Sequence, residues 1–83
     1  MTKKQFEVFR EALRCLSFNG TTIKSFAERI NMSPHTIYNY ISGQKPSEKH
    51  YNYILYAIEK YYPSALAQGR EIIEMEKENE RRI

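Results

Sequence analysis

The feature that most limits how this 83-residue chain can fold is a pair of short helical segments separated by only three residues. Apolar residues recur at helical spacing over about residues 22–30 and 34–42. Threonine and serine are preferred N-cap residues, asparagine and glycine accept the positive φ angle that ends a helix, and proline fits the first helical turn. Residues of these types delimit both segments, at Thr22, Asn31, Ser33, Pro34 and Gly43. Two helices joined by so tight a turn have the geometry of a helix-turn-helix unit.

Further helices are expected on both sides of this pair. The first covers about residues 3–17, where a capping-box pattern precedes a stripe of phenylalanine and leucine residues. Another is expected between the N-cap residue Ser47 and the helix-ending Pro63. We therefore expect an all-α fold of four to five short helices, with residues 1–63 as one domain and residues 64–83 as a charged C-terminal helix or tail.

The composition is that of an ordinary globular protein with a small positive charge. The chain has 13 Lys and Arg residues and 10 acidic ones, a net charge of +3, and all the acidic residues are glutamates. Residues 1–63 carry nine basic and five acidic side chains, whereas residues 64–83 carry four and five. The excess of positive charge in residues 1–63 favours a polyanion as their partner, and the Glu-rich residues 64–83 favour a different partner.

The sequence also bounds the compartment and the chemistry. The single cysteine, Cys15, cannot form an internal disulfide, and neither a signal peptide nor an apolar run of about 20 residues is present, so we expect a cytoplasmic protein that does not contact a membrane. His35 and His50 have no cysteine or aspartate at metal-ligand spacing. Neither a Gly-rich phosphate loop nor a nucleophile elbow occurs. We expect no enzyme activity, no metal and no cofactor.

The helix expected over residues 34–42 would present a polar outer face. At about 100° per residue, His35 and Asn39 lie opposite the apolar side, with Thr36 and Tyr38 at the edges of the face. Amide and hydroxyl groups of this kind hydrogen-bond to base edges in the major groove of DNA. An ordinary solvated helix face is the alternative interpretation.

Over residues 22–43, with Pro46 shortly after, the sequence resembles the phage-repressor and Cro-like helix-turn-helix family, whose fold is lambda-repressor-like. The resemblance is carried by Phe26-Ala27, the apolar residues at 30, 32 and 37, and the helix-delimiting residues. Asn31 stands where the family usually has glycine, and Ile41 where it often has a polar residue. The resemblance implies a sequence-specific transcriptional regulator of double-stranded DNA. Such proteins are commonly repressors of their own operon or of a phage or mobile-element operon.

The same resemblance implies two sets of DNA-contacting residues, and the chain's own composition suggests a dimer surface. Base reading falls on the second helix, at His35, Thr36, Tyr38 and Asn39, with only apolar contact from Pro34. Phosphate contacts are expected from the two helix N-termini and the loop after the second helix, at Thr22, Lys24, Ser33, Gln44 and Lys45. A homodimer is expected because the core is small and apolar or aromatic residues are left over, at Tyr53, Tyr56, Leu66, Ile72 and Ile73. A twofold dimer would place the two reading helices about 34 Å apart on a palindromic site.

A protein-interaction adaptor on the same fold is the alternative function. Residues 64–83 would then bind a protein partner, as in an antitoxin or an inhibitor of a nucleic-acid-guided defence complex. The DNA reader requires His35 and Asn39, whereas the adaptor requires the C-terminal segment.

Overall fold

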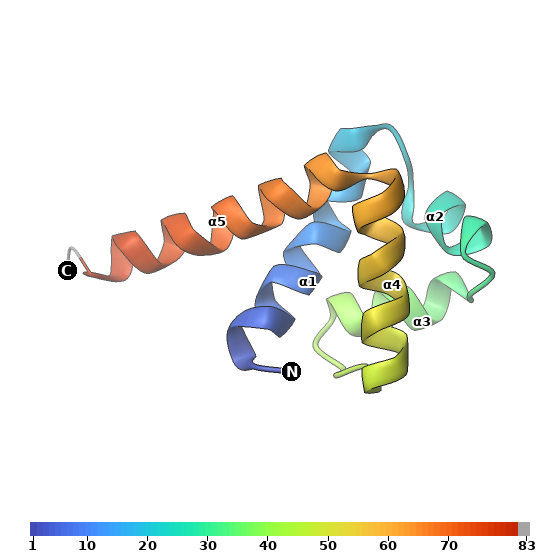
Figure 1. Cartoon of the computed structure of the whole chain (residues 1–83), viewed down its shortest axis with the longest axis horizontal. Coiled ribbons are helices and arrows are strands. Elements are labelled where there is room, and N and C mark those ends of the chain that lie inside the picture. The colour runs from blue at the N-terminus through green and yellow to red at the C-terminus, as the bar shows by residue number, and fades with distance from the viewer. Residues whose placement is uncertain (82–83) are drawn as a thin grey trace.

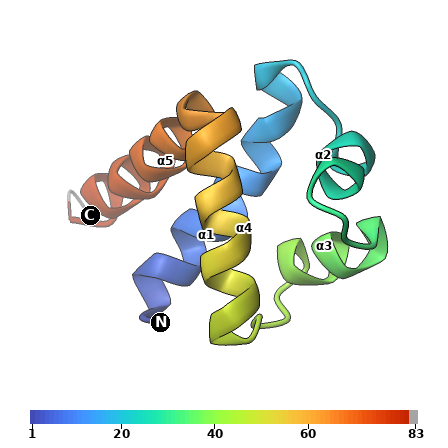
Figure 2. The same cartoon turned by 45° about the vertical axis from the view of Figure 1, so that its right-hand side comes forward.

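The structure, a computed structural model, describes the backbone of residues 1–81 and the side chains of residues 1–78. All regular elements in this range are helical, which confirms the all-α class: α1 (Lys3–Cys15), a 3-10 turn η1 (Leu16–Asn19), α2 (Ile23–Arg29), α3 (Pro34–Ile41), α4 (Glu48–Tyr61) and α5 (Pro63–Arg81). The molecule measures 43 × 26 × 19 Å along its principal axes. α2 and α3 lie at one end of the long axis, and the last turns of α5 extend beyond the other helices at the opposite end (Figures 1 and 2). Over the described residues, no helix is both long enough and apolar enough to cross a lipid bilayer.

The capping box at the start of α1 forms as predicted. The Thr2 hydroxyl accepts from the backbone N–H of Gln5 at 3.1 Å, and the Gln5 side chain accepts from the backbone N–H of Thr2 at 2.8 Å. The α-helix ends at Cys15, two residues earlier than expected, because the chain tightens into η1. Gly20 then ends this turn with a φ angle of 85°, a left-handed conformation that glycine adopts readily.

The tight turn between α2 and α3 also forms as expected. Asn31 has a φ angle of 59°, a left-handed conformation that asparagine accepts more readily than most residues. The backbone N–H of Met32 then donates to the carbonyl of Ala27 at 2.9 Å and closes the end of α2. The Thr22 hydroxyl caps α2, but Ser33 precedes α3 without a side-chain cap bond. The backbone N–H of Thr36, which such a cap would accept from, instead donates to the carbonyl of Ser33 at 3.1 Å, and proline suits the first position of α3.

One hydrophobic core joins all the helices. Its largest fully buried side chains are Phe9, Leu13, Leu16, Phe26, Ile37, Ile54 and Ile58. Phe9 lies at its centre, with its ring centroid 6.2 Å from that of Tyr40 in α3 and 5.3 Å from that of Tyr51 in α4. Through Phe9, α1 therefore contacts both α3 and α4 and fixes their positions relative to each other.

The C-terminal segment corrects two expectations. Pro63 begins α5 instead of only ending α4, because proline suits the first turn of a helix. Leu66 and Ile73, which were expected on a dimer surface, are buried within the single chain, and Ile72 is half-buried. The cause is a close crossing of α5 over α1 at Gly69, where a Cβ atom would lie 2.7 Å from the backbone nitrogen of Ala12. Much of the apolar face of α5 is therefore used inside one copy of the protein.

Cys15 allows a direct test of this packing. Burial raises the pKa of the Cys15 thiol, and the negative charge of Glu11 raises it further. At about pH 8 the folded protein therefore holds less reactive thiolate than an exposed cysteine, whose pKa is about 8.5. We expect a thiol reagent to label Cys15 about tenfold more slowly, or slower still, in the folded protein than in guanidinium.

The raised pKa of Cys15 also determines how this residue makes folding stability depend on pH. A neutral thiol held in the folded state favours folding fully below the ordinary thiol pKa, and this contribution declines as pH rises through the raised value. The labelling rate, followed by absorbance as a function of pH, checks the expected slow reaction of Cys15 in the folded protein. Equal rates in the folded and unfolded protein would contradict the buried position.

Candidate nucleic-acid interface

The outer side of α3 carries the four residues predicted to read bases. His35 is exposed, 53% of Tyr38 is exposed, and Thr36 and Asn39 are half-buried. The opposite side of the helix is buried in the core through Ile37 and Tyr40. The separation of polar and apolar faces predicted for this helix is therefore present.

The polar groups on this face are available to a partner. Among the described residues, the side chains of His35, Thr36 and Asn39 take part in no hydrogen bond or ion pair. The helix carries no Lys, Arg, Asp or Glu, so no carboxylate on α3 itself would repel a phosphate backbone. The face therefore consists of hydrogen-bond donors and acceptors beside an exposed tyrosine ring.

Side chains from two neighbouring helices hold α3 in place, and sequence reasoning missed them. The Arg10 Nε atom donates to the carbonyl of Ile41 at 2.9 Å, and the Arg14 Nη2 atom donates to the same oxygen at 3.3 Å. This carbonyl belongs to the C-terminal end of α3, where positive charge is favourable. The four-residue spacing of the two arginines places them on one face of α1, but it does not reveal which helix they meet.

A hydrogen bond between two rings also joins α3 to α4. The Tyr40 hydroxyl lies 2.7 Å from the Nδ1 atom of His50. Burial raises the pKa of the Tyr40 hydroxyl, so the hydroxyl stays protonated at neutral pH. α4 therefore brings His50 half-buried against α3.

The predicted phosphate contacts lie in the segments before and after α3. Lys24 on α2 is exposed, as are Gln44 and Lys45 in the loop that leads from α3 to α4. Thr22 is exposed at the start of α2, although its hydroxyl is already used as a cap. Ser33 is exposed at the start of α3 and has no cap bond. Of the predicted phosphate contacts, one lysine therefore precedes α3 in the chain and another follows it.

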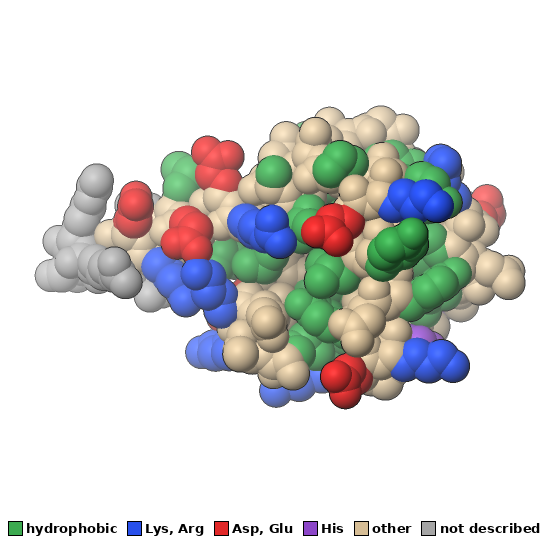
Figure 3. All heavy atoms as spheres, viewed as in Figure 1, with side chains coloured by type: hydrophobic (Ala, Val, Ile, Leu, Met, Phe, Trp, Pro, Cys, Tyr) green, Lys and Arg blue, Asp and Glu red, His purple; other side chains and the backbone are tan. Residues whose placement is uncertain are grey.

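The outer side of α4 carries a second surface, here called the α4 stripe and made of Lys49, Tyr53, Tyr56 and Lys60. Tyr53 is 48% and Tyr56 62% exposed, so the predicted aromatic surface is present. The Tyr53 hydroxyl donates to the carbonyl of Ile30 at 2.7 Å, which fixes this ring against the end of α2. In the space-filling view hydrophobic side chains gather along α4, with Lys and Arg side chains near both ends of the helix (Figure 3).

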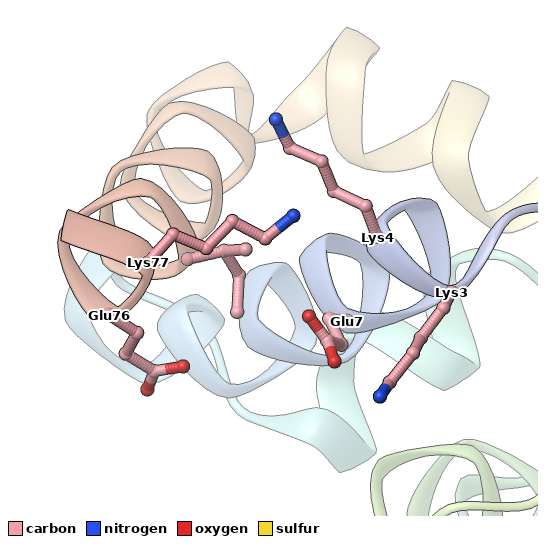
Figure 4. Close-up of a pocket in the computed structure, with 6 residues that line it drawn as sticks. Lys3, Lys4, Glu7, Glu76 and Lys77 are labelled. Atoms are coloured by element: carbon pink, nitrogen blue, oxygen red, sulfur yellow. The ribbon is translucent and has the colours of Figure 1, made fainter. Parts of the chain in front are cut away.

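A shallow cavity lies where α5 passes the start of α1. Its lining combines three lysines, two glutamates and one isoleucine: Lys3, Lys4, Glu7, Ile73, Glu76 and Lys77. Glu7 and Lys77 extend into the space between the helices, whereas Lys3 and Lys4 extend in opposite directions from α1 (Figure 4). The Lys4 Nζ atom lies 2.5 Å from a carboxylate oxygen of Glu74. Because both signs of charge line this cavity, it favours neither an anion nor a cation.

Comparison with known proteins adds no relative, because no protein-family model, curated protein or solved structure matches this chain.

Proposed function

We propose that this protein is a sequence-specific double-stranded DNA-binding regulator of transcription with a lambda-repressor-like helix-turn-helix fold. In this proposal α2, the turn at Asn31 and α3 form the helix-turn-helix unit, and α3 enters the major groove. One observation carries the proposal: α3 is anchored from behind by buried side chains, while its outward polar groups have no hydrogen-bond partner among the side chains of residues 1–78.

The chemistry of the face matches the edges of base pairs. The Asn39 amide can pair with the N6 and N7 atoms of adenine through two hydrogen bonds, and Thr36 can bond to either type of base. His35 can donate to a guanine acceptor or to a phosphate oxygen. Tyr38 supplies an apolar surface for a thymine methyl group. Contacts of this kind specify sequence, whereas phosphate contacts position the protein.

Phosphate contacts complete the proposed interface. The N-terminus of α2 presents backbone N–H groups together with Lys24, and the loop after α3 presents Gln44 and Lys45. These contacts would bind DNA of any sequence and would weaken as salt rises. By its resemblance the protein would act as a repressor of its own operon or of a mobile-element operon, as a homodimer on a palindromic site.

Fluorescence anisotropy with a duplex selected from a random pool tests the proposal. Replacing His35 and Asn39 together by alanine is expected to weaken binding to the selected duplex by about 100-fold, because each good base contact contributes about 1–3 kcal/mol of discrimination. Binding to a shuffled duplex should change little, since the phosphate contacts remain. Asn52→Ala, at an exposed polar position on α4, is the control and should bind as the wild type does.

Two results would contradict DNA reading by α3. One is a selection that enriches no sequence. The other is weak, equal binding to both duplexes that the double variant leaves unchanged. Either result would direct attention to the adaptor alternative, in which a protein partner binds the C-terminal segment.

A further inference from the structure

Two exposed apolar surfaces lie outside the proposed DNA-reading face. The first is the α4 stripe. The second, here called the α5 patch, lies where η1 meets α5 and consists of Phe18, Glu71, Ile72, Met75 and Glu78. Phe18 is 81% and Met75 56% exposed, and both line a cavity beside Ile72. Such large exposed apolar side chains are typical of surfaces that bind another molecule.

The α4 stripe is bounded by positive charge. Its residues follow one another at four, three and four positions, so they form a single line on the outside of the helix with a lysine at each end. The Lys60 Nζ atom lies 5.9 Å from the centroid of the Tyr56 ring. Arg29 of α2 adds a third cation, 4.0 Å above the ring of Tyr61 next to the stripe. Glu59 is the nearest carboxylate on α4 and lies about 90° around the helix.

The α5 patch is bounded by negative charge. Glu71 and Glu78 lie seven residues apart on the same side of α5, with Met75 between them. Both glutamates are exposed. Among the side chains of α5 up to residue 78, the basic ones, Arg70 and Lys77, line cavities on other sides of the helix. Each surface therefore has an apolar centre between two charged ends, and the charges are positive on the α4 stripe and negative on the α5 patch.

Like surfaces would repel one another. If two copies of the α4 stripe met face to face, a lysine would oppose a lysine at both ends, whether the helices ran parallel or antiparallel. Two copies of the α5 patch would oppose glutamate to glutamate in the same way. Like charges placed directly opposite each other across an interface oppose association. A contact between unlike surfaces brings lysine to glutamate at both ends instead.

We propose that the α4 stripe of one copy binds the α5 patch of a second copy. The stripe spans about 16 Å along its helix and the two glutamates span about 10 Å, a difference that long lysine side chains can cover. Met75 would then lie against Tyr53 and Tyr56, and a thioether sulfur makes favourable contacts with aromatic rings. The inference deepens the proposed function because it locates the homodimer contact, and it rests on that function only for the role of the dimer on DNA.

Sedimentation equilibrium of the full chain without DNA tests the contact through exchange of charge. Lys49→Glu/Lys60→Glu is expected to weaken self-association by about tenfold or more, and Glu71→Lys/Glu78→Lys should do the same. The chain with all four changes should regain association close to that of the wild type, because the pairs are restored with their signs exchanged. All four positions are exposed, and circular dichroism checks that each variant remains folded.

A matched control separates this contact from DNA binding. Lys24→Glu/Lys45→Glu makes the same change in net charge as the stripe variant, at exposed residues that belong to neither surface, so self-association should persist while DNA binding is lost. A wild type that stays monomeric up to submillimolar concentration would overturn the inference. So would a four-residue exchange that fails to restore association, or a control that weakens association as much as the stripe variant. None of these outcomes bears on whether α3 reads DNA.

Discussion

Replacing Gly69 with valine is expected to lower the free energy of unfolding by about 3 kcal/mol. A Cβ atom at this position would lie 2.7 Å from the backbone nitrogen and 3.0 Å from the Cα atom of Ala12, and 3.1 Å from the carbonyl oxygen of Val8. These are backbone atoms of a regular helix, so they cannot move aside without shifting α1. α5 would have to lift away from α1, which would expose Leu66 and Ile73 to water.

For the smaller change Gly69→Ala, helix propensity and the contact with α1 predict opposite signs for the change in the free energy of unfolding. By helix propensity alone alanine stabilises a helix interior by about 0.5–1 kcal/mol relative to glycine. The clash with α1 predicts a net loss of stability instead. Urea unfolding followed by circular dichroism measures both variants. Ala67→Val, at an exposed position two residues earlier in the same helix, is the control and should cost less than about 1 kcal/mol. A midpoint that rises for Gly69→Ala would show that the two helices do not cross this closely.

Replacing Phe9 with alanine is expected to cost about 3–5 kcal/mol of stability. The side chain is fully buried and its ring packs against those of Tyr40 and Tyr51. A domain of this size has a total stability of about 4–12 kcal/mol, so the variant should unfold at far lower urea concentration or lose its cooperative transition. Because Tyr40 lies in α3, the position of the proposed reading helix should be affected as well.

Phe18→Ala is the matched control for this change. It removes the same side chain from a position that is 81% exposed, so the free energy of unfolding should change by less than about 0.5 kcal/mol at low protein concentration. Phe9→Leu, which keeps an apolar group in the cavity, should lie between the two. Similar losses for the Phe9→Ala and Phe18→Ala variants would contradict the position of Phe9 at the centre of the core.

Local signals in the sequence predicted most of the helix boundaries. The capping box at Thr2, the turn at Asn31 and the left-handed glycine at residue 20 all form as their residue types indicate. The polar outer face of α3 was predicted in the same way, because a rotation of about 100° per residue sorts side chains without reference to any other helix. Each of these inferences depends on interactions within a few residues of the chain.

Contacts between distant parts of the chain were not predictable in this way. Arg10 and Arg14 meet the end of α3, and His50 meets Tyr40, across 10 to 31 residues of sequence. No spacing rule identifies such partners, because many pairs of polar residues satisfy the same local pattern. The anchoring of the proposed reading helix therefore became visible only in the folded structure.

The sequence by itself determined that this chain is helical, where most of its helices begin and end, and which side of α3 is polar. The tertiary structure decided which apolar residues remain on the surface. The missing side chain of Gly69 lets α5 approach α1 and bury Leu66 and Ile73, and nothing within a few residues of Gly69 shows this. The physical reason is that helix formation depends on near neighbours, while burial depends on the shape of a surface contributed by a distant segment.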